Sequence, residues 1–489
     1  MLTEGKRDMK KWVHVFILSS LLISCVPKLE KPPDLEIAAP QYWTSQTETI
    51  EGTIAQWWTD FDDPGLNEAI EAALNENYNL KAAAARVDAA VAMARIVGSE
   101  LYPQVNLGLS GSRRKQNFVG FPFGESSDGV PSVTSSLFGV SLNVSWEIDL
   151  WGRIRAGKSA AVTDYEATIA DYIGFQLSLV GQTAKAWFAA VEAERQVQLS
   201  EATLENYRTT NAQVHRRYRL GLRPSLDVRL SESNVADAEA LLFLRRNQLQ
   251  GIKRQLETLV GRYPAGNIKL SSSLSPELKP VPAGLPAEVV RKRPDLISAE
   301  KRLASSYARV IESERALYPR ISLTASGGTS TDDLKNLLNG DFSVWNLIGN
   351  LLQPIFQGGR LRAGVDLAEA RELEALAFYA QSVLYAYSEV ETALEAETWL
   401  AEREKALQTA VDQAMAARDL AQSRYARGLT DLIEVLESQR RAFLSQSQLL
   451  IVKRQRLDNR IDLYLALGGD FMNAKSNETT LFRETPSND

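Results

Sequence analysis

The sequence predicts a mainly α-helical chain with a small β part, built from a duplicated unit of helix, β-hairpin, long helix, turn and helix. Three observations predict it: an internal repeat, two long stretches of helical periodicity, and short segments of strict apolar and polar alternation. Leu101-Tyr102-Pro103 returns as Leu317-Tyr318-Pro319, an offset of 317 − 101 = 216 residues. Duplicated units usually cannot bury their apolar faces alone. We therefore expect the function in an assembled object and not in one pocket.

A second offset extends the repeat. Gly152-Arg153-Ile154-Arg155-Ala156-Gly157 returns as Gly359-Arg360-Leu361-Arg362-Ala363-Gly364, an offset of 359 − 152 = 207 residues. The difference between the two offsets makes the first hairpin nine residues longer than the second. The predicted domains are a signal peptide 1–24, an acylated tether 25–63, a first repeat 64–265, a linker 266–285, a second repeat 286–470 and a polar tail 471–489.

Composition excludes several classes of protein. The net charge of −6 does not indicate nucleic-acid binding, which is typical of chains with an excess of basic residues. Two histidines and one cysteine rule out a disulfide framework and a His/Cys zinc site within one chain. The sequence shows no nucleophile elbow, phosphate loop or cluster of metal ligands, so we predict no enzyme, no catalytic residue, no metal and no cofactor other than a covalent lipid.

The N-terminus predicts export and lipidation. Four basic residues precede the apolar run from Val13 to Ile23, which is too short for a permanent membrane anchor. The run ends Leu22-Ile23-Ser24-Cys25, which resembles a bacterial lipobox with cleavage before an acylated (palmitate-bearing) Cys25. The alternative is an ordinary secretory signal. Val26 follows in place of the Asp that favours inner-membrane retention, so the outer membrane is expected. Either Met1 or Met9 serves as the start.

The β part follows a first helix expected over residues 64–100. Residues 138–149 alternate without a break between apolar and polar side chains, and Gln104–Ser112 is their predicted partner strand. A polar loop is expected at about 119–136. The second hairpin is expected at about 318–357, with a regular strand from Ile321 and a less regular one from Phe342 to Phe356. The first hairpin should span about 102–151.

These strands have the length of tilted transmembrane strands. Aromatic residues cluster near the strand ends, as at membrane interfaces: Tyr102, Phe118, Trp151, Tyr318 and Trp345. A sheet in hydrocarbon must close, and four strands are too few to close alone. Three chains of four strands predict a shared 12-stranded barrel and an obligate trimer. The alternative is two surface hairpins packed on the helices.

Two very long helices are predicted from Arg153 to Arg219 and from Arg360 to Arg427. Each ends at a glycine, Gly221 or Gly428, in the position after a helix. The tip turns, about 219–225 and 426–431, lead to antiparallel helices Ser225–Val260 and Asp431–Leu467. A shorter helix is expected over 286–316. Helices alone would also fit a coiled-coil scaffold, but such a scaffold does not explain matched hairpins.

The segment Asp149-Leu150-Trp151-Gly152-Arg153 resembles the strand-to-helix signature of the outer membrane factor (TolC-like) family. Arg424-Tyr425-Ala426-Arg427-Gly428-Leu429, with Val435 to Arg440, is similar to that family's second tip motif. The resemblance spans the mature chain and points to the lipoprotein branch that partners resistance-nodulation-division pumps. It implies a trimer whose 12-stranded barrel continues into a 12-helix periplasmic α-barrel.

The resemblance also implies site residues. The closed periplasmic gate is expected at the tips. Acidic side chains from three chains would focus the electric field there and concentrate cations. The expected gate residues are Arg217, Tyr218, Tyr425, Ile433, Glu434, Leu436, Glu437 and Arg440. Arg440 would form ion pairs that hold the tips shut. Adaptor-binding tips are expected at Gly221, Leu222, Arg223, Gly428, Leu429 and Thr430. Glu147 and Asp149, on the polar strand face, would point into the barrel lumen. An ordinary solvated helix face is the alternative for the tip charges.

The predicted function is therefore an outer-membrane exit duct of a tripartite efflux system that passively exports small molecules such as drugs. Its expected partners are two further copies of the chain, a periplasmic adaptor (membrane fusion) protein, an inner-membrane resistance-nodulation-division pump and outer-membrane lipid. The alternatives are a duct for type I secretion or heavy-metal efflux and, in another class, a lipid-anchored coiled-coil scaffold without a pore. The sequence does not name the exported substrate.

Overall fold

The computed structural model describes residues 43–44, 56–119, 130–270, 274, 281, 286, 289 and 292–469. The predicted signal peptide, the predicted lipidation site Cys25 and the tail 471–489 lie outside the described residues. The chain forms two compact units, each assembled from parts of both repeats. One contains residues 88–166 and 300–377, and the other contains residues 35–87, 167–299 and from 378 onward.

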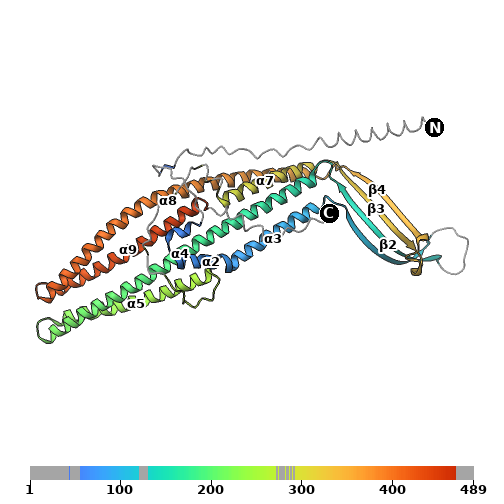
Figure 1. Cartoon of the computed structure of the whole chain (residues 1–489). Helices are drawn as coiled ribbons and strands as arrows, with labels where there is room; N and C mark the ends of the chain where they lie inside the picture. The colour runs from blue at the N-terminus through green and yellow to red at the C-terminus, as the bar shows by residue number, and fades with distance from the viewer. Residues whose placement is uncertain are drawn as a thin grey trace. The chain divides into compact units, whose positions relative to one another are not determined.

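The first unit contains a four-stranded antiparallel sheet in the order β1-β2-β3-β4 (Figure 1). The strands are β1 Gln104–Asn117, β2 Ser132–Ile148, β3 Arg320–Thr331 and β4 Ser343–Leu352. Short 3-10 turns, η2 Leu334–Asn336 and η3 Gly340–Phe342, connect β3 to β4. Both predicted hairpins are thus present, and β2 and β3 join them into one sheet.

The first hairpin lies within its predicted range, but its two strands are longer than the sequence predicted. β1 continues past Ser112 to Asn117, and β2 begins at Ser132, inside the segment predicted as loop. The register is continuous to the pair Asn117 and Ser132. The prediction ended β1 where the charged residues begin, but backbone pairing continues because an exposed strand tolerates charged side chains at its end. This correction places three basic residues within β1.

The sheet has one apolar and one polar face, because residues directly opposite each other share a face. Leu107 pairs with Leu142 and Val144 pairs with Ala325, which places them on the apolar face. Leu107 is 71% exposed and Leu109 is 74% exposed, so this face is uncovered in the single chain. An apolar face of this kind requires a partner or a lipid environment.

The strands meet the helices of the same unit at an aromatic contact between the two repeats. The rings of Trp151 and Tyr318 stack with centroids 5.5 Å apart. Trp151 Nε1 donates to the Pro319 carbonyl at 2.7 Å, and Trp146 Nε1 donates to the Leu101 carbonyl at 3.0 Å. The predicted aromatic cluster therefore lies where the strands end, and its polar atoms are hydrogen-bonded.

The helices are α2 Pro64–Glu76, α3 Tyr78–Ser99, α4 Arg153–Arg219, α5 Ser225–Leu259, α7 Pro294–Arg315, α8 Arg360–Ala426 and α9 Leu432–Ala466, with a 3-10 turn, η1 Trp57–Phe61, before them. The two long helices α4 and α8 match their predicted ranges to within one residue. None of the helices in the described part of the chain is both long and apolar enough to cross a membrane.

The prediction of a single helix over residues 64–100 is wrong, because the helix is interrupted at Asn77. This residue has extended backbone angles, and its side chain accepts a hydrogen bond from Leu80 N–H at 3.0 Å. An asparagine in this position satisfies a free amide at the start of a helix. The break therefore begins α3 as a separate helix after α2.

The second unit has the larger core. Trp57 stacks on Tyr464 with ring centroids 5.2 Å apart, and Phe61 meets Phe188 edge-on at 5.1 Å. The indole N–H of Trp187 donates to Asp63 Oδ2 at 2.9 Å, while Asp63 also caps α2. Aromatic pairs of this kind add stability beyond the area they bury. These contacts hold η1 and the start of α2 against α4 and α9.

Candidate functional site

The two tip turns, α4 to α5 and α8 to α9, have the same backbone structure. In the first, Leu222 N–H donates to the Arg217 carbonyl and Gly221 N–H to the Tyr218 carbonyl, both at 2.9 Å. The second repeats this pattern through Gly428 and Leu429. Gly221 has φ 71° and Gly428 has φ 77°, angles that glycine adopts without strain. The duplicated sequence thus produces two helix ends with the same hydrogen-bond pattern.

Arg217 of the first turn binds the second turn. Its Nη2 donates to the carbonyl of Ala426, the last residue of α8, at 2.8 Å. A cation at this position also favours the negative end of the helix dipole. The guanidinium lies over the ring of Tyr425, 4.5 Å from its centroid. One side chain therefore caps α8 and covers its last aromatic residue.

Arg223 binds the second turn from the other end. Its Nη1 lies 3.0 Å from Asp431 Oδ1, and its Nη2 donates to the Thr430 carbonyl at 3.2 Å. Its guanidinium lies 5.2 Å from the Tyr425 ring centroid. The Arg223 side chain is only 18% exposed, whereas Asp431 is 82% exposed, so solvent screens this ion pair from the side of the carboxylate. We call Arg217, Arg223, Tyr425 and Asp431 the tip clasp.

Tyr425 is the buried centre of the tip clasp. It is 1% exposed and packs with Val214, Val228, Leu432 and Val435. Burial raises the pKa of its hydroxyl, and the two nearby guanidiniums oppose that shift. A ring between two cations has favourable electrostatics on its π faces. The clasp thus joins both turns of one chain through a buried aromatic residue, and this arrangement holds the two tips together.

Glu437 and Arg440, predicted as part of the gate, form an ion pair within α9. Arg440 donates to both carboxylate oxygens of Glu437, at 2.8 and 2.9 Å, and Arg441 donates at 2.7 Å. Hydrogen bonds from Arg441 and then Arg440 lower the pKa of Glu437. Within the described part of a single chain, Arg440 does not contact Tyr218, Tyr425 or Arg217. The basic partners of Tyr425 come instead from the first turn.

The other predicted tip residues divide into exposed and packed groups. Ile433 is 67% exposed, Leu222 67% and Leu429 68%, whereas Leu436 is half-buried against the neighbouring core. Thr430 donates to Glu434 in the first turn of α9. Sequence reasoning placed Arg223 among the exposed adaptor contacts and missed Asp431. The sequence signal that could have identified Arg223 is a difference between the two repeats, since Thr430 occupies the position in the second turn that Arg223 occupies in the first.

Glu147 and Asp149, predicted to line a lumen, both bind the start of α4. Glu147 Oε1 lies 3.0 Å from Arg153 Nη2. Asp149 accepts hydrogen bonds from the Ile154 and Arg155 amides at 3.1 and 2.9 Å, and its side chain is 8% exposed. Such contacts satisfy the free amides of a helix start. In one chain, these carboxylates fix the turn from β2 into α4.

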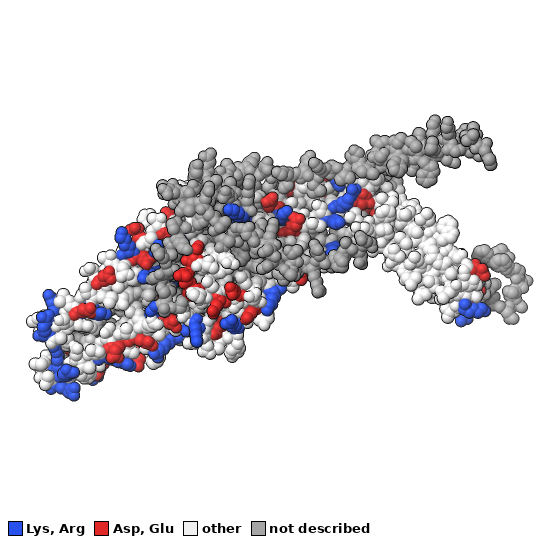
Figure 2. All heavy atoms as spheres, in the orientation of Figure 1, with Lys and Arg blue, Asp and Glu red and all other residues white. Residues whose placement is uncertain are grey.

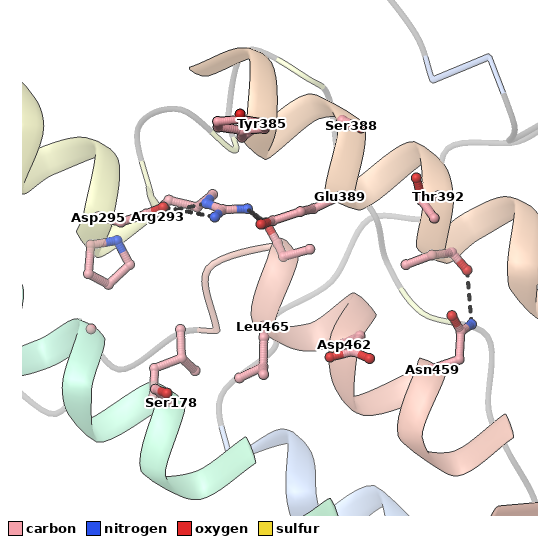
Figure 3. Close-up of a pocket in the computed structure, with 15 residues that line it drawn as sticks. Ser178, Arg293, Asp295, Tyr385, Ser388, Glu389, Thr392, Asn459, Asp462 and Leu465 are labelled. Atoms are coloured by element: carbon pink, nitrogen blue, oxygen red, sulfur yellow. Dashed lines mark hydrogen bonds and ion pairs between the residues drawn. The ribbon is translucent and has the colours of Figure 1, made fainter. Parts of the chain in front are cut away.

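A recess of about 540 Å³ lies in the second unit where α9 ends and α7 begins (Figure 3). Arg293 stands in it between Asp295 and Glu389, at 2.8 and 2.7 Å. Asp462, at its edge, pairs with Lys185. Every charged side chain that lines the recess thus has an ion-pair partner. Among the described residues no cluster of three or more His, Cys, Asp or Glu could hold a metal ion.

Comparison with known proteins assigns the family. Residues 69–262 and 285–469 match the family described as "Outer membrane efflux protein". The chain belongs to this family. It is 32% identical over 460 residues to the pyoverdine export outer membrane protein OpmQ of Pseudomonas putida, covering 92% of this chain and 96% of that protein. It is 34% identical over 410 residues to the solvent efflux pump outer membrane protein SrpC of Pseudomonas putida, covering 84% and 86%.

Solved structures of this family share the fold. The chain superposes on the crystal structure of a membrane protein from Pseudomonas aeruginosa with a TM-score of 0.81 and 30% identity, covering 91% of this chain and 97% of the other. The predicted family, the mainly helical duplicated fold and the outer-membrane efflux function are therefore confirmed. Membership also agrees with the prediction that the chain is not an enzyme. A pore-free scaffold does not fit an efflux family.

Proposed function

We propose that three copies of this chain form the exit duct of a tripartite efflux system and that the tip clasp keeps its periplasmic end closed. The observation that carries the gate is the pair of arginines, Arg217 and Arg223, that joins the two turns of one chain around Tyr425. An opening movement must separate these turns. The clasp therefore has to break before the tips part.

The trimer is supported by the open edges of the sheet. β1 and β4 are the outer strands of the four-stranded order, and both carry strongly exposed side chains on the apolar face, such as Leu107 of β1 and Trp345 of β4. Unpaired strand edges are costly in hydrocarbon, and four strands are too few to close a barrel. Pairing β1 of one chain with β4 of the next in a ring of three gives a barrel of twelve strands without an edge.

The exposed leucines at the tips are the proposed contact for a periplasmic adaptor. Leu220, Leu222 and Leu429 are each more than 60% exposed beside the clasp. Exposed apolar side chains clustered at a tip indicate a protein contact. An adaptor that binds them reaches the clasp residues without entering the duct. The energy source would be an inner-membrane resistance-nodulation-division pump, as the family resemblance implies.

The substrate is proposed to be a small molecule. Two relatives are named for the export of pyoverdine and of solvents, both small molecules. The lipobox-like Leu22-Ile23-Ser24-Cys25 supports an acyl anchor on Cys25 in addition to the barrel. Radiolabelled palmitate on the intact chain, lost in Cys25→Ser, tests the anchor. The alternative is a type I secretion duct. A gene for a polypeptide exporter next to the gene for this chain would favour it.

The gate is tested by single-channel recording of the purified trimer in planar bilayers. In Arg217→Gln/Arg223→Gln, the contacts of both arginines to the second turn are lost, so single-channel conductance should rise. In cells that carry this variant, a large antibiotic should leak in through the open duct. The matched control is Arg216→Gln/Arg219→Gln, which removes the same charge from exposed positions on the same helix end. Equal conductance in the clasp variant, the control and the unchanged protein would refute the clasp as the gate.

A further inference from the structure

The apolar face of the sheet ends in a basic pair on β1. Val105, Leu107 and Leu109 alternate on this face, and the same alternation continues through Gly111 to Arg113 and Lys115. Arg114, between them, lies on the polar face with Ser110 and Ser112. The register is unbroken along this strand, so the assignment of faces follows directly from the cross-strand pairs.

The height of the basic pair matches the outer surface of the membrane. Eight residues separate Val105 from Arg113, which is about 27 Å along a strand and roughly 21 Å of height at a 40° tilt. The apolar band of an outer-membrane barrel is about 25 Å tall. The aromatic contact of Trp151 and Tyr318 lies at the other end, next to the helices. Arg113 and Lys115 therefore lie at the outer edge of the band, facing lipid.

Among the described residues, no acidic side chain pairs with Arg113 or Lys115. The strand segments 104–117 and 132–146 contain no Asp or Glu. Their cross-strand neighbours on the same face are Ser136, opposite Arg113, and Thr134, opposite Lys115. Figure 2 shows Lys and Arg atoms together with Asp and Glu atoms at this end of the sheet, while the rest of its visible surface is almost free of charge.

We propose that Arg113 and Lys115, flanked by Ser136 and Thr134, bind the phosphate groups of the glycolipid in the outer leaflet. Guanidinium binds phosphate through paired hydrogen bonds, and a lysine adds a point charge. Two hydroxyls complete a set of donors on one face. This inference rests on the outer-membrane placement of the barrel and goes beyond the export function. A trimer would hold three such sites around its rim.

The test measures how much bisphosphorylated lipid A stays bound to the detergent-solubilised trimer, by native mass spectrometry. In Arg113→Gln/Lys115→Gln, bound lipid A should fall about thirtyfold, as expected for the loss of two basic residues near an anionic surface. The matched control is Arg114→Gln, which removes a neighbouring charge from the opposite face and should leave binding unchanged. Dephosphorylated lipid A should bind the unchanged protein weakly, and inorganic phosphate should not displace the phosphorylated lipid.

Three outcomes would overturn the proposal. These are unchanged lipid binding in the double variant, equal loss in Arg114→Gln, and loss of the trimer by the double variant without loss of lipid from the trimers that remain. The last would assign the pair to the seam between chains, where Asp333 and Asp341 of the β3–β4 connection supply acids. Conductance in phosphatidylcholine bilayers, which lack the glycolipid, is recorded in parallel. A double variant that conducts but does not bind lipid A separates this inference from the channel function.

Discussion

Asn77 and Arg293 occupy equivalent positions of the two repeats, an offset of 293 − 77 = 216 residues, and make the same contact. The Asn77 Nδ2 donates to the carbonyl of Leu259, the last residue of α5, at 2.8 Å. Arg293 Nη1 donates to the carbonyl of Ala466, the last residue of α9, at 3.2 Å. Each side chain thus joins the end of one helix to the start of another. Arg293 also forms ion pairs with Asp295 and Glu389.

This equivalence predicts that asparagine substitutes for Arg293 better than alanine does. Arg293→Ala loses the carbonyl contact and both ion pairs, which should cost roughly 2 kcal/mol. The cost stays modest because Asp295 and Glu389 are more than half exposed and regain hydration. Arg293→Asn keeps a donor for Ala466 and should lose about half as much. The midpoint of heat dissociation of the purified trimer measures both, and equal midpoints would contradict the shared capping role.

Tyr425 should tolerate phenylalanine but not alanine. The guanidiniums of Arg217 and Arg223 face the ring, which Tyr425→Phe retains, so conductance should remain low. Tyr425→Ala leaves a cavity in a buried cluster, at a cost of about 3–5 kcal/mol, and removes the centre of the clasp. It should raise single-channel conductance. Tyr218→Ala, at the equivalent but 45% exposed position, is the control and should behave like the unchanged protein. Raised conductance in both alanine variants would argue against a specific role for Tyr425.

Much of the fold was predictable because its signals are local. The glycines at 221 and 428 end the long helices, and strict alternation sets the two faces of β2. The family resemblance pointed to the tips. What the sequence did not predict depends on contacts between distant segments. Arg223 reads as an exposed tip residue, yet it reaches Asp431 across 208 positions of sequence. The break at Asn77 carries no proline or glycine, and its side chain both caps the Leu80 amide and contacts the distant carbonyl of Leu259.

Asp458 should make the stability of the helical unit depend on pH. Burial raises the pKa of this carboxyl from 3.8 to about 6, with Arg454 and Lys185 opposing the shift and Asp462 and Glu192 adding to it. A raised carboxyl pKa means that the folded chain binds the proton more tightly than the unfolded chain. Its stabilising effect is complete below about pH 4 and is lost as pH rises through about 6.

The change over that interval is on the order of 3 kcal/mol. Asp458→Asn should remove this dependence, while Arg454 keeps Glu192 as a partner at 3.6 Å. Melting midpoints of the purified protein between about pH 4.5 and pH 8 measure the effect. The unchanged chain should lose stability through this range more steeply than the variant. Parallel pH profiles for the two proteins would show that Asp458 is not the titrating group.

Adjacent glycines in β3 should respond oppositely to alanine. A methyl group on Gly328 would collide with the backbone carbonyl of Val140 in β2, where neither strand can move without breaking the ladder. A methyl group on Gly327 meets nothing within 4 Å. Gly328→Ala should therefore abolish the heat-labile trimer band on a gel, because the sheet cannot pair in register. Gly327→Ala places a small apolar group on the face exposed to lipid and should assemble normally. If both variants assemble equally well, the close approach of β2 and β3 at this point is not required for the barrel.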